Sequence, residues 1–258
     1  MNKAEKTLLD NYIYVVSYLI HWGELWKAYG VLRNAPVSLE DNKDVRDLII
    51  NVSKKLDEIS NMQNYGQDGI NVRTGFIDPE NAGKLVKFQI LKKLIKKLKL
   101  KKLVDVGCYT GWLGRNLAAE GIEVHGIDTH PVIIYVANKL ASGTLATFER
   151  LTAQELGYVH PHTYEGAILF DVLEHCFDTE ITIRSVEKSL KKGGWMFICL
   201  PNPEAEEKSP LAPLELHEHL HAFTKKKLEK IFGKKKDLKI DRVINEDKCP
   251  MWFISYQI

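Results

Sequence analysis

The chain has 258 residues, of which 45% are hydrophobic and 27% are charged, a balance that excludes a disordered or collagen-like polypeptide. Its 36 lysines and arginines nearly balance 34 aspartates and glutamates, so the net charge of +2 creates no whole-protein field that would attract nucleic acid or an anionic membrane. The four cysteines lie far apart without a C-x-x-C pair, which favours reduced thiols and a cytoplasmic location.

Residues 1–62 have a helical pattern throughout. Apolar residues recur at helical spacing from Leu8 to Ile20, and a later stripe runs from Val45 to Ile59. The best candidate for a membrane span, Tyr12–Ile20, has only nine residues, less than half of what a spanning helix needs. We therefore predict a helical N-terminal subdomain without a membrane span. It packs on the main domain, contacts a partner protein or forms a dimer.

Residues 63–79 are irregular and contain glycine, which predicts a linker. We interpret residues 64–76 within it as a lid that keeps water out of an active site, with Tyr65 and Phe76 as apolar surface. The proline-containing segment Pro201–Leu216 is an alternative cover. A helix is predicted to start at Asp78 and Pro79, because these residues suit an N-cap and a first helical position.

That helix carries an apolar face and a basic face. The apolar face consists of Leu85, Phe88, Leu91, Ile95 and Leu98. Seven lysines follow between Lys92 and Lys102. Such a run could form a nucleic-acid or membrane patch, but lysines that alternate with core-spaced leucines are typical of a solvated helix face.

From Leu103 onward, strand-like and helical segments alternate, which indicates an α/β domain with a mainly parallel sheet. Strands are predicted at Leu103–Val106, Val124–Ile127, Ala146–Phe148, Ala167–Phe170 and Met196–Leu200, and helices at Trp112–Glu120, Pro131–Leu140 and Ile181–Leu190. Two further strands, Leu238–Ile244 and Trp252–Gln257, are close enough to pair as an antiparallel hairpin. The predicted fold class is α/β, a Rossmann-like and mostly parallel seven-stranded sheet with an antiparallel C-terminal hairpin and a helical N-terminal subdomain.

The most informative segment is VDVGCYTGWLG, which runs from Val104 to Gly114. A buried strand leads into a glycine turn and then into a helix, so the backbone can approach a ligand beside unpaired N–H groups. Doubly wound sheets bind ligands at this edge. The spacing G-x-x-x-G-x-x-G differs from the dinucleotide fingerprint, and no Gly-Lys-Ser/Thr follows, which excludes a phosphate-binding P-loop.

This segment resembles motif I of the class I S-adenosylmethionine-dependent methyltransferases, in particular the small-molecule and ubiquinone-biosynthesis-like type. Asp128, at the end of the next strand, matches the acid that binds the ribose hydroxyls in this family. Further matches are LTAQEL at 151–156, DVLEH at 171–175 and LKKGG at 190–194, although Thr152 and Lys192 stand where aspartate and proline are more usual. The resemblance covers residues 80–258.

The resemblance implies that S-adenosylmethionine is the cofactor. A sulfonium cofactor is intrinsically reactive, so the protein mainly has to align a nucleophile with its methyl group. The cofactor-binding residues expected on this basis are Asp105, Gly107, Cys108, Gly111, Asp128, Thr129, Ala153, Gln154 and Asp171.

The expected catalytic residues are His175, Glu174 and His219. His175 would act as general base on a hydroxyl, and the alternative that it only packs beside the site stays open. Asp171 would likewise touch the cofactor or cap the following helix. His217, His219 and His221 can share one face of an extended segment, and Thr224 is predicted to cap the helix after them.

Asp171, Glu174, His175 and one histidine from 217–221 could also form a mixed carboxylate–imidazole metal site. This set resembles the metal ligands of the small-RNA 2′-O-methyltransferases. Because D-V-L-E-H also occurs in metal-independent relatives, we predict no metal.

The predicted function is methyl transfer from S-adenosylmethionine to a small molecule or glycan, at oxygen. An RNA methyltransferase is one alternative, suggested by lysine runs at 92–102 and 225–236. The near-neutral charge and the lack of a recognisable RNA-binding module argue against nucleic acid. A second alternative is a catalytically silent methyltransferase-like module whose N-terminal helices bind a partner, and intact motif I and Asp128 argue against it.

Overall fold

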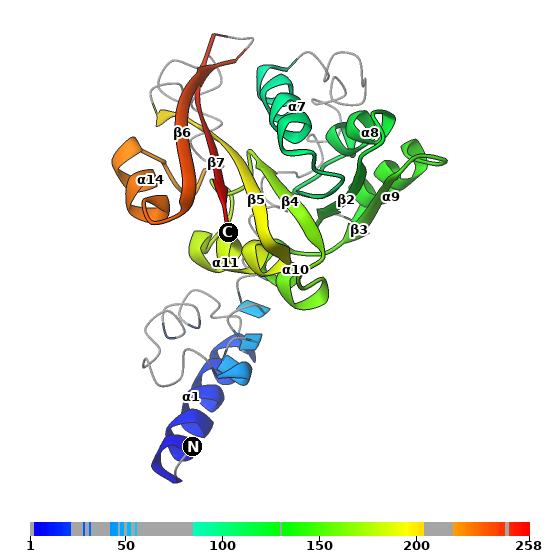
Figure 1. The fold of residues 1–258 in the computed structure, drawn as a ribbon. Helices are drawn as coiled ribbons and strands as arrows, with labels where there is room; N and C mark the ends of the chain where they lie inside the picture. The colour runs from blue at the N-terminus through cyan, green and yellow to red at the C-terminus, as the bar shows by residue number, and fades with distance from the viewer. Residues whose placement is uncertain are drawn as a thin grey trace. The chain divides into compact units, whose positions relative to one another are not determined.

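The computed structural model describes residues 3–21, 85–129, 131–203, 219–245 and 248–258, together with isolated positions between residues 28 and 55 (Figure 1). The chain divides into two compact units, residues 1–63 and 64–258. The predicted lid at 64–76, the predicted helix start at Asp78 and the alternative cover beyond residue 203 lie outside the described residues.

The first unit contains helix α1, Lys3–His21, which buries Leu9 and Val16. These two residues are seven apart, as expected for one face of a helix. None of the helices that the structure describes combines the length and the apolarity needed to cross a membrane.

The second unit alternates helices and strands in the predicted order. The helices are α7 (Val86–Leu98), α8 (Trp112–Ala119), α9 (Pro131–Leu140), α10 (Ala153–Val159), α11 (Thr179–Ser189) and α14 (Lys225–Phe232). The strands are β1 (Lys102–Val106), β2 (Glu123–Asp128), β3 (Ala146–Arg150), β4 (Tyr164–Phe170), β5 (Leu190–Pro201), β6 (Lys236–Ile244) and β7 (Pro250–Gln257).

The seven strands form one sheet in the order β3-β2-β1-β4-β5-β7-β6 (Figure 1). Strands β1 to β5 pair in parallel, whereas β7 runs antiparallel to both β5 and β6. The predicted fold class, including the C-terminal hairpin, is therefore confirmed. The strand order reverses between β1 and β4, where doubly wound sheets bind their ligands.

Alternate residues of the sheet supply two core layers. Val104 of β1 belongs to a cluster with residues of α10, α11 and α14, whereas Leu103 belongs to a cluster with α7 and α8. Helix α7 buries Phe88, Leu91 and Ile95, as its apolar spacing predicts. The opposite face of α7 carries exposed lysines, which include Lys93, Lys96 and Lys97.

Two segments differ from the sequence prediction. Helix α10 is an additional helix, and it starts at a capping box in which Thr152 and Glu155 satisfy each other's backbone N–H groups. Strand β5 begins at Leu190, earlier than the predicted start at Met196, so the Lys-Lys-Gly-Gly sequence at 191–194 lies inside the strand, at an irregularity in its pairing with β4. All four cysteines are free, and Cys108, Cys176 and Cys199 are buried.

Candidate functional site

The glycine turn between β1 and α8 is fastened to the end of β2. The carbonyl of Ile127 accepts hydrogen bonds from the N–H groups of Gly107 (2.8 Å) and Cys108 (3.0 Å). The Asp128 carboxylate accepts a bond from the N–H of Tyr109 at 3.1 Å. The turn and the acid that was predicted to bind ribose therefore form one connected unit at the carboxyl edge of the sheet.

Two glycines of this turn are required by conformation and by space. Gly107 and Gly111 have φ angles of 68° and 74°, in the left-handed region that favours glycine. A Cβ on Gly111 would lie 2.3 Å from the Phe148 ring, and a Cβ on Gly107 would lie 2.6 Å from the Val172 side chain. The side chains of Phe148 and Val172 therefore leave room only for glycine at these two positions. Gly107 is exposed, so a ligand can reach the turn there.

Asp105, two residues before the turn, is buried with a relative exposure of 3%. Burial, together with the nearby Asp128 charge, raises the pKa of Asp105 to about 8. Its Oδ2 atom has no hydrogen-bond partner among the described residues. A buried carboxylate oxygen of this kind is costly, and a cationic ligand group would reduce the cost.

Lys87 of α7 forms an ion pair with Asp171, directly after β4, and sequence reasoning missed this residue. The Lys87 ammonium also lies 5.7 Å from the centre of the Phe170 ring. Burial lowers the pKa of Lys87, but Asp171 and other acidic groups outweigh burial, so the net shift is upward. Nothing in the sequence distinguishes Lys87 from the many other lysines of this region.

Asp171 does not cap the following helix, contrary to one of the two interpretations of the sequence. Helix α11 begins at Thr179, and its N-cap is Asp178, whose carboxylate accepts bonds from the N–H groups of Glu180 and Ile181, both at 3.0 Å. Asp171 instead has a left-handed backbone, with φ of 55°. It stands at the carboxyl edge of β4, paired with Lys87.

The three predicted catalytic residues lie together after β4. Glu174, His175 and His219 each offer a ligand atom, and these atoms are all within 4.8 Å of one another. The rings of His175 and His219 meet edge to face with centroids 4.9 Å apart. Glu174 is buried, and its carbonyl accepts a hydrogen bond from the N–H of Leu220 at 2.8 Å. This backbone bond brings two segments that are distant in sequence into contact.

The other histidines of the 217–221 segment differ from His219. His221 is turned to the backbone, because a ring nitrogen contacts the carbonyl of Cys176 at 3.0 Å. Burial is the main cause of the lowered pKa of His221. His217 lies outside the described residues. Thr224 caps α14 by accepting a bond from the N–H of Lys227, as predicted.

Four of the predicted cofactor residues make contacts within the protein. The Cys108 side chain packs in a core cluster with Phe148, and burial raises the pKa of its thiol. The Gln154 amide donates to the Thr182 hydroxyl of α11 at 3.1 Å. Thr129 offers its carbonyl to the Arg150 guanidinium at 2.9 Å, and Ala153 opens α10. The side chains of Cys108 and Gln154 thus support the structure around the site.

Comparison with known proteins gives a consistent family assignment. Residues 80–243 match the model of a family described as a methyltransferase domain. The chain is 31% identical over 119 residues to a ubiquinone biosynthesis O-methyltransferase of Nitrosomonas europaea. The aligned region covers 45% of this chain and 51% of the relative. A protein of the same name from Aliivibrio fischeri is 31% identical over 131 residues, with 46% and 56% covered. The chain thus spans about half the length of these curated relatives.

Solved structures share the fold at low sequence identity. The plantazolicin methyltransferase BamL, solved with a triazolic desmethylPZN analog and SAH, has a TM-score of 0.61 at 12% identity, covering 82% of this chain and 98% of its own. A possible histamine N-methyltransferase from Thermotoga maritima has a TM-score of 0.58 at 14% identity, covering 76% and 99%. At these identities the likeness concerns the fold alone.

Proposed function

The chain belongs to the class I S-adenosylmethionine-dependent methyltransferases, and on this basis we propose that it transfers a methyl group from S-adenosylmethionine to a hydroxyl oxygen of a small molecule or glycan. The cofactor, when bound, supplies a methyl group on a sulfonium that is reactive enough to need no activation. The observation that carries the proposal is the group of Glu174, His175 and His219 next to the glycine turn. Val172, in the same loop, packs against Gly107.

The residues around the turn fit the cofactor. Gly107 and Gly111 give the turn its left-handed backbone conformation, and Gly107 is exposed. The Asp128 carboxylate can accept hydrogen bonds from two adjacent ribose hydroxyls. The buried Oδ2 atom of Asp105 has no hydrogen-bond partner among the described residues, and a cationic group of the bound cofactor would favour the ionised form of this carboxyl. Asp171, paired with Lys87, borders the same edge of the sheet.

His175 is assigned the role of general base. With cofactor and acceptor bound, a ring nitrogen of His175 would take the proton of the acceptor hydroxyl as the acceptor oxygen bonds to the methyl carbon. The bond between that carbon and the sulfonium sulfur would break in the same step, which would leave S-adenosylhomocysteine. The buried Glu174 carboxylate stabilises the imidazolium that results, and the His219 ring fixes the orientation of His175 by their edge-to-face contact. The relatives named as O-methyltransferases support oxygen as the acceptor atom.

The proposal is tested by calorimetry with S-adenosylhomocysteine and by methyl-transfer assays on phenols and oligosaccharides. Asp128→Ala is expected to weaken S-adenosylhomocysteine binding at least tenfold. His175→Gln should retain that binding but lose about 10²- to 10⁴-fold in transfer rate, the usual contribution of a general base. The exposed His162→Gln is the matched control and should behave as wild type. A wild-type chain that does not bind S-adenosylhomocysteine would refute the proposal.

A second mode of action is favoured by the same group of residues. One carboxylate and two imidazoles within 4.8 Å suit a divalent cation, and Glu174, His175 and His219 would then be its ligands. An ion held there would supply Lewis-acid polarisation of the acceptor hydroxyl. Loss of transfer on treatment with EDTA, restored by Mn²⁺, Fe²⁺ or Zn²⁺, would favour this mode, whereas unchanged transfer would favour a metal-free base.

A further inference from the structure

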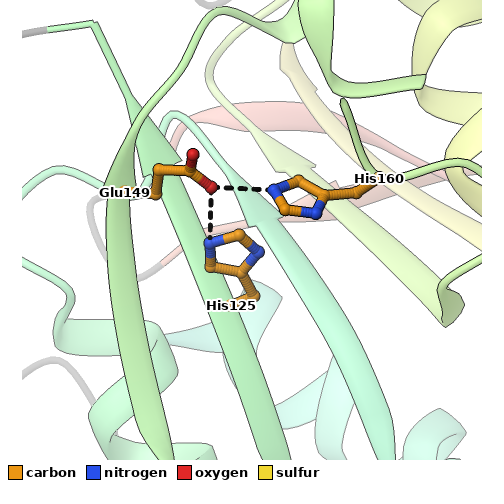
Figure 2. A group of neighbouring side chains, drawn as sticks. All are labelled: His125, Glu149 and His160. Carbon is orange, nitrogen blue, oxygen red and sulfur yellow. Dashed lines mark hydrogen bonds and ion pairs between the residues drawn. The ribbon is translucent and has the colours of Figure 1, made fainter. Parts of the chain in front are cut away.

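A second group of metal-ligating side chains lies on strands β2 and β3 and at the end of α10. The Glu149 carboxylate points at both the His125 and the His160 imidazoles (Figure 2). Glu149 Oε2 is 2.8 Å from His160 Nε2 and 3.3 Å from His125 Nε2. The rings of His125 and His160 meet edge to face, with centroids 4.9 Å apart. One ligand atom from each residue lies within 4.8 Å of the others.

The fold brings these residues together from three separate elements. Strands β2 and β3 are parallel neighbours, and Ile127 is the register partner of Glu149. His125, two residues before Ile127, therefore points to the same face of the sheet as Glu149. His160 is the C-cap of α10, the helix that follows β3. No sequence motif joins the three positions, which span residues 125–160.

The chemistry of the group suits a divalent ion of the zinc class. Zinc binds imidazole nitrogen and carboxylate oxygen at about 2.0–2.2 Å in a tetrahedron, which separates neighbouring ligand atoms by about 3.4 Å. The His125–Glu149 distance of 3.3 Å already meets this value, and the His160–Glu149 distance of 2.8 Å needs a small opening. Nitrogen ligands favour zinc and its transition-metal neighbours over Mg²⁺ or Ca²⁺.

A fourth residue holds the ring of His125 in the required orientation. The Nδ1 atom of His125 forms a hydrogen bond with the Tyr164 hydroxyl, which leaves Nε2 directed at Glu149. Metal-binding histidines usually have such a partner on the other ring nitrogen. Burial raises the pKa of Tyr164, so its hydroxyl stays protonated.

We propose that His125, Glu149 and His160 bind a zinc-class divalent ion, with a remaining coordination position for water or an external ligand. The side chains of Glu149 and His160 are 40% and 28% exposed, so the ion can enter from solvent. Because the three ligands come from β2, β3 and α10, the ion links the outermost parallel strand to the body of the sheet.

The test uses the full chain after removal of bound metal with EDTA. The chain is titrated with Co²⁺, whose visible absorption reports tetrahedral coordination, and Zn²⁺ is then added as a competitor. Wild type is expected to bind Co²⁺ saturably and to release it to Zn²⁺. His160→Gln and Glu149→Gln should weaken binding more than about 100-fold, and Tyr164→Phe about 10- to 100-fold, since it removes only the partner of a ligand. Zn²⁺ should raise the melting temperature of wild type more than that of His160→Gln.

His219→Gln is the control for the other group of candidate ligands. It should leave the Co²⁺ spectrum of the His125 site unchanged, even if that other group also binds metal. Circular dichroism checks that each variant is folded. The inference is overturned if folded wild type shows no saturable Co²⁺ or Zn²⁺ binding, or if binding is lost in His219→Gln but retained in His160→Gln.

Discussion

At the scale of single residues, Asp105 is the clearest conflict between burial and charge. Its pKa is about 8 in the folded chain against an ordinary value of 3.8. Between these pH values the folded chain holds a proton that the unfolded chain has released, so the free energy of unfolding falls as the pH rises. Asp105 lies at the edge of the sheet where the cofactor is proposed to bind, and residues with strongly shifted pKa values are common at functional sites.

Asp105→Asn removes this titration, so the variant should gain stability over wild type as the pH rises from about 4 to about 8. The gain is at most about 1.4 kcal/mol per pH unit, the value for one proton. Melting temperatures of both proteins across this range measure it. Exposed Asp241→Asn, which also removes one carboxylate, is the control. Parallel pH profiles for wild type and Asp105→Asn would show that Asp105 is ionised when buried.

Gly111→Ala should destabilise the chain by about 2–5 kcal/mol, because it adds a strained positive φ and a clash with Phe148. Gly121→Ala is a matched control: Gly121 also has a positive φ, of 80°, but a Cβ there meets no atom within 4 Å. That variant should cost only about 1 kcal/mol. Urea unfolding compares the two, and equal losses would mean that the Phe148 ring moves aside without cost.

At the scale of elements, helix caps decide where α11 and α14 begin. Asp178 is buried and accepts two backbone N–H bonds at 3.0 Å, whereas Thr224 is exposed and accepts one at 3.3 Å. Asp178→Ala should therefore cost about 1–2 kcal/mol of unfolding free energy, and Thr224→Ala about 0.5–1 kcal/mol. Urea unfolding of both variants tests the order, and a larger loss for Thr224→Ala would contradict it.

At the scale of the whole molecule, the two compact units suggest separable roles. Residues 64–258 form one unit, and it contains all the residues proposed to hold the cofactor. A chain of residues 64–258 is expected to show the circular dichroism of a folded α/β protein, since a compact domain with its own core can fold alone. Its dissociation constant for S-adenosylhomocysteine should lie within about threefold of that of the full chain. An unfolded product would mean that residues 1–63 are needed for stability, and a change in oligomeric state would assign them to a dimer contact.

Local sequence patterns determined the order of the strands and of the helices other than α10, the glycine turn and the position of Asp128 at the end of its strand. These features depend on apolar periodicity and backbone conformation, which neighbouring residues specify. The grouping of Glu174, His175 and His219 was also predicted, because the resemblance to a known family indicated that these residues lie at one site. The predicted cap at Thr224 was correct for the same local reason.

Only the tertiary structure decided which distant side chains meet. The Lys87–Asp171 pair, the Phe148 ring beneath Gly111 and the His125–Glu149–His160 group all join residues that no short pattern connects. Their contacts depend on sheet register and on how helices cross the sheet, and both are set by long-range packing of the whole unit. The sequence therefore determined the fold class and the edge of the sheet where the cofactor is proposed to bind. The structure determined the charge pairing at that edge and brought together the second group of proposed ligands.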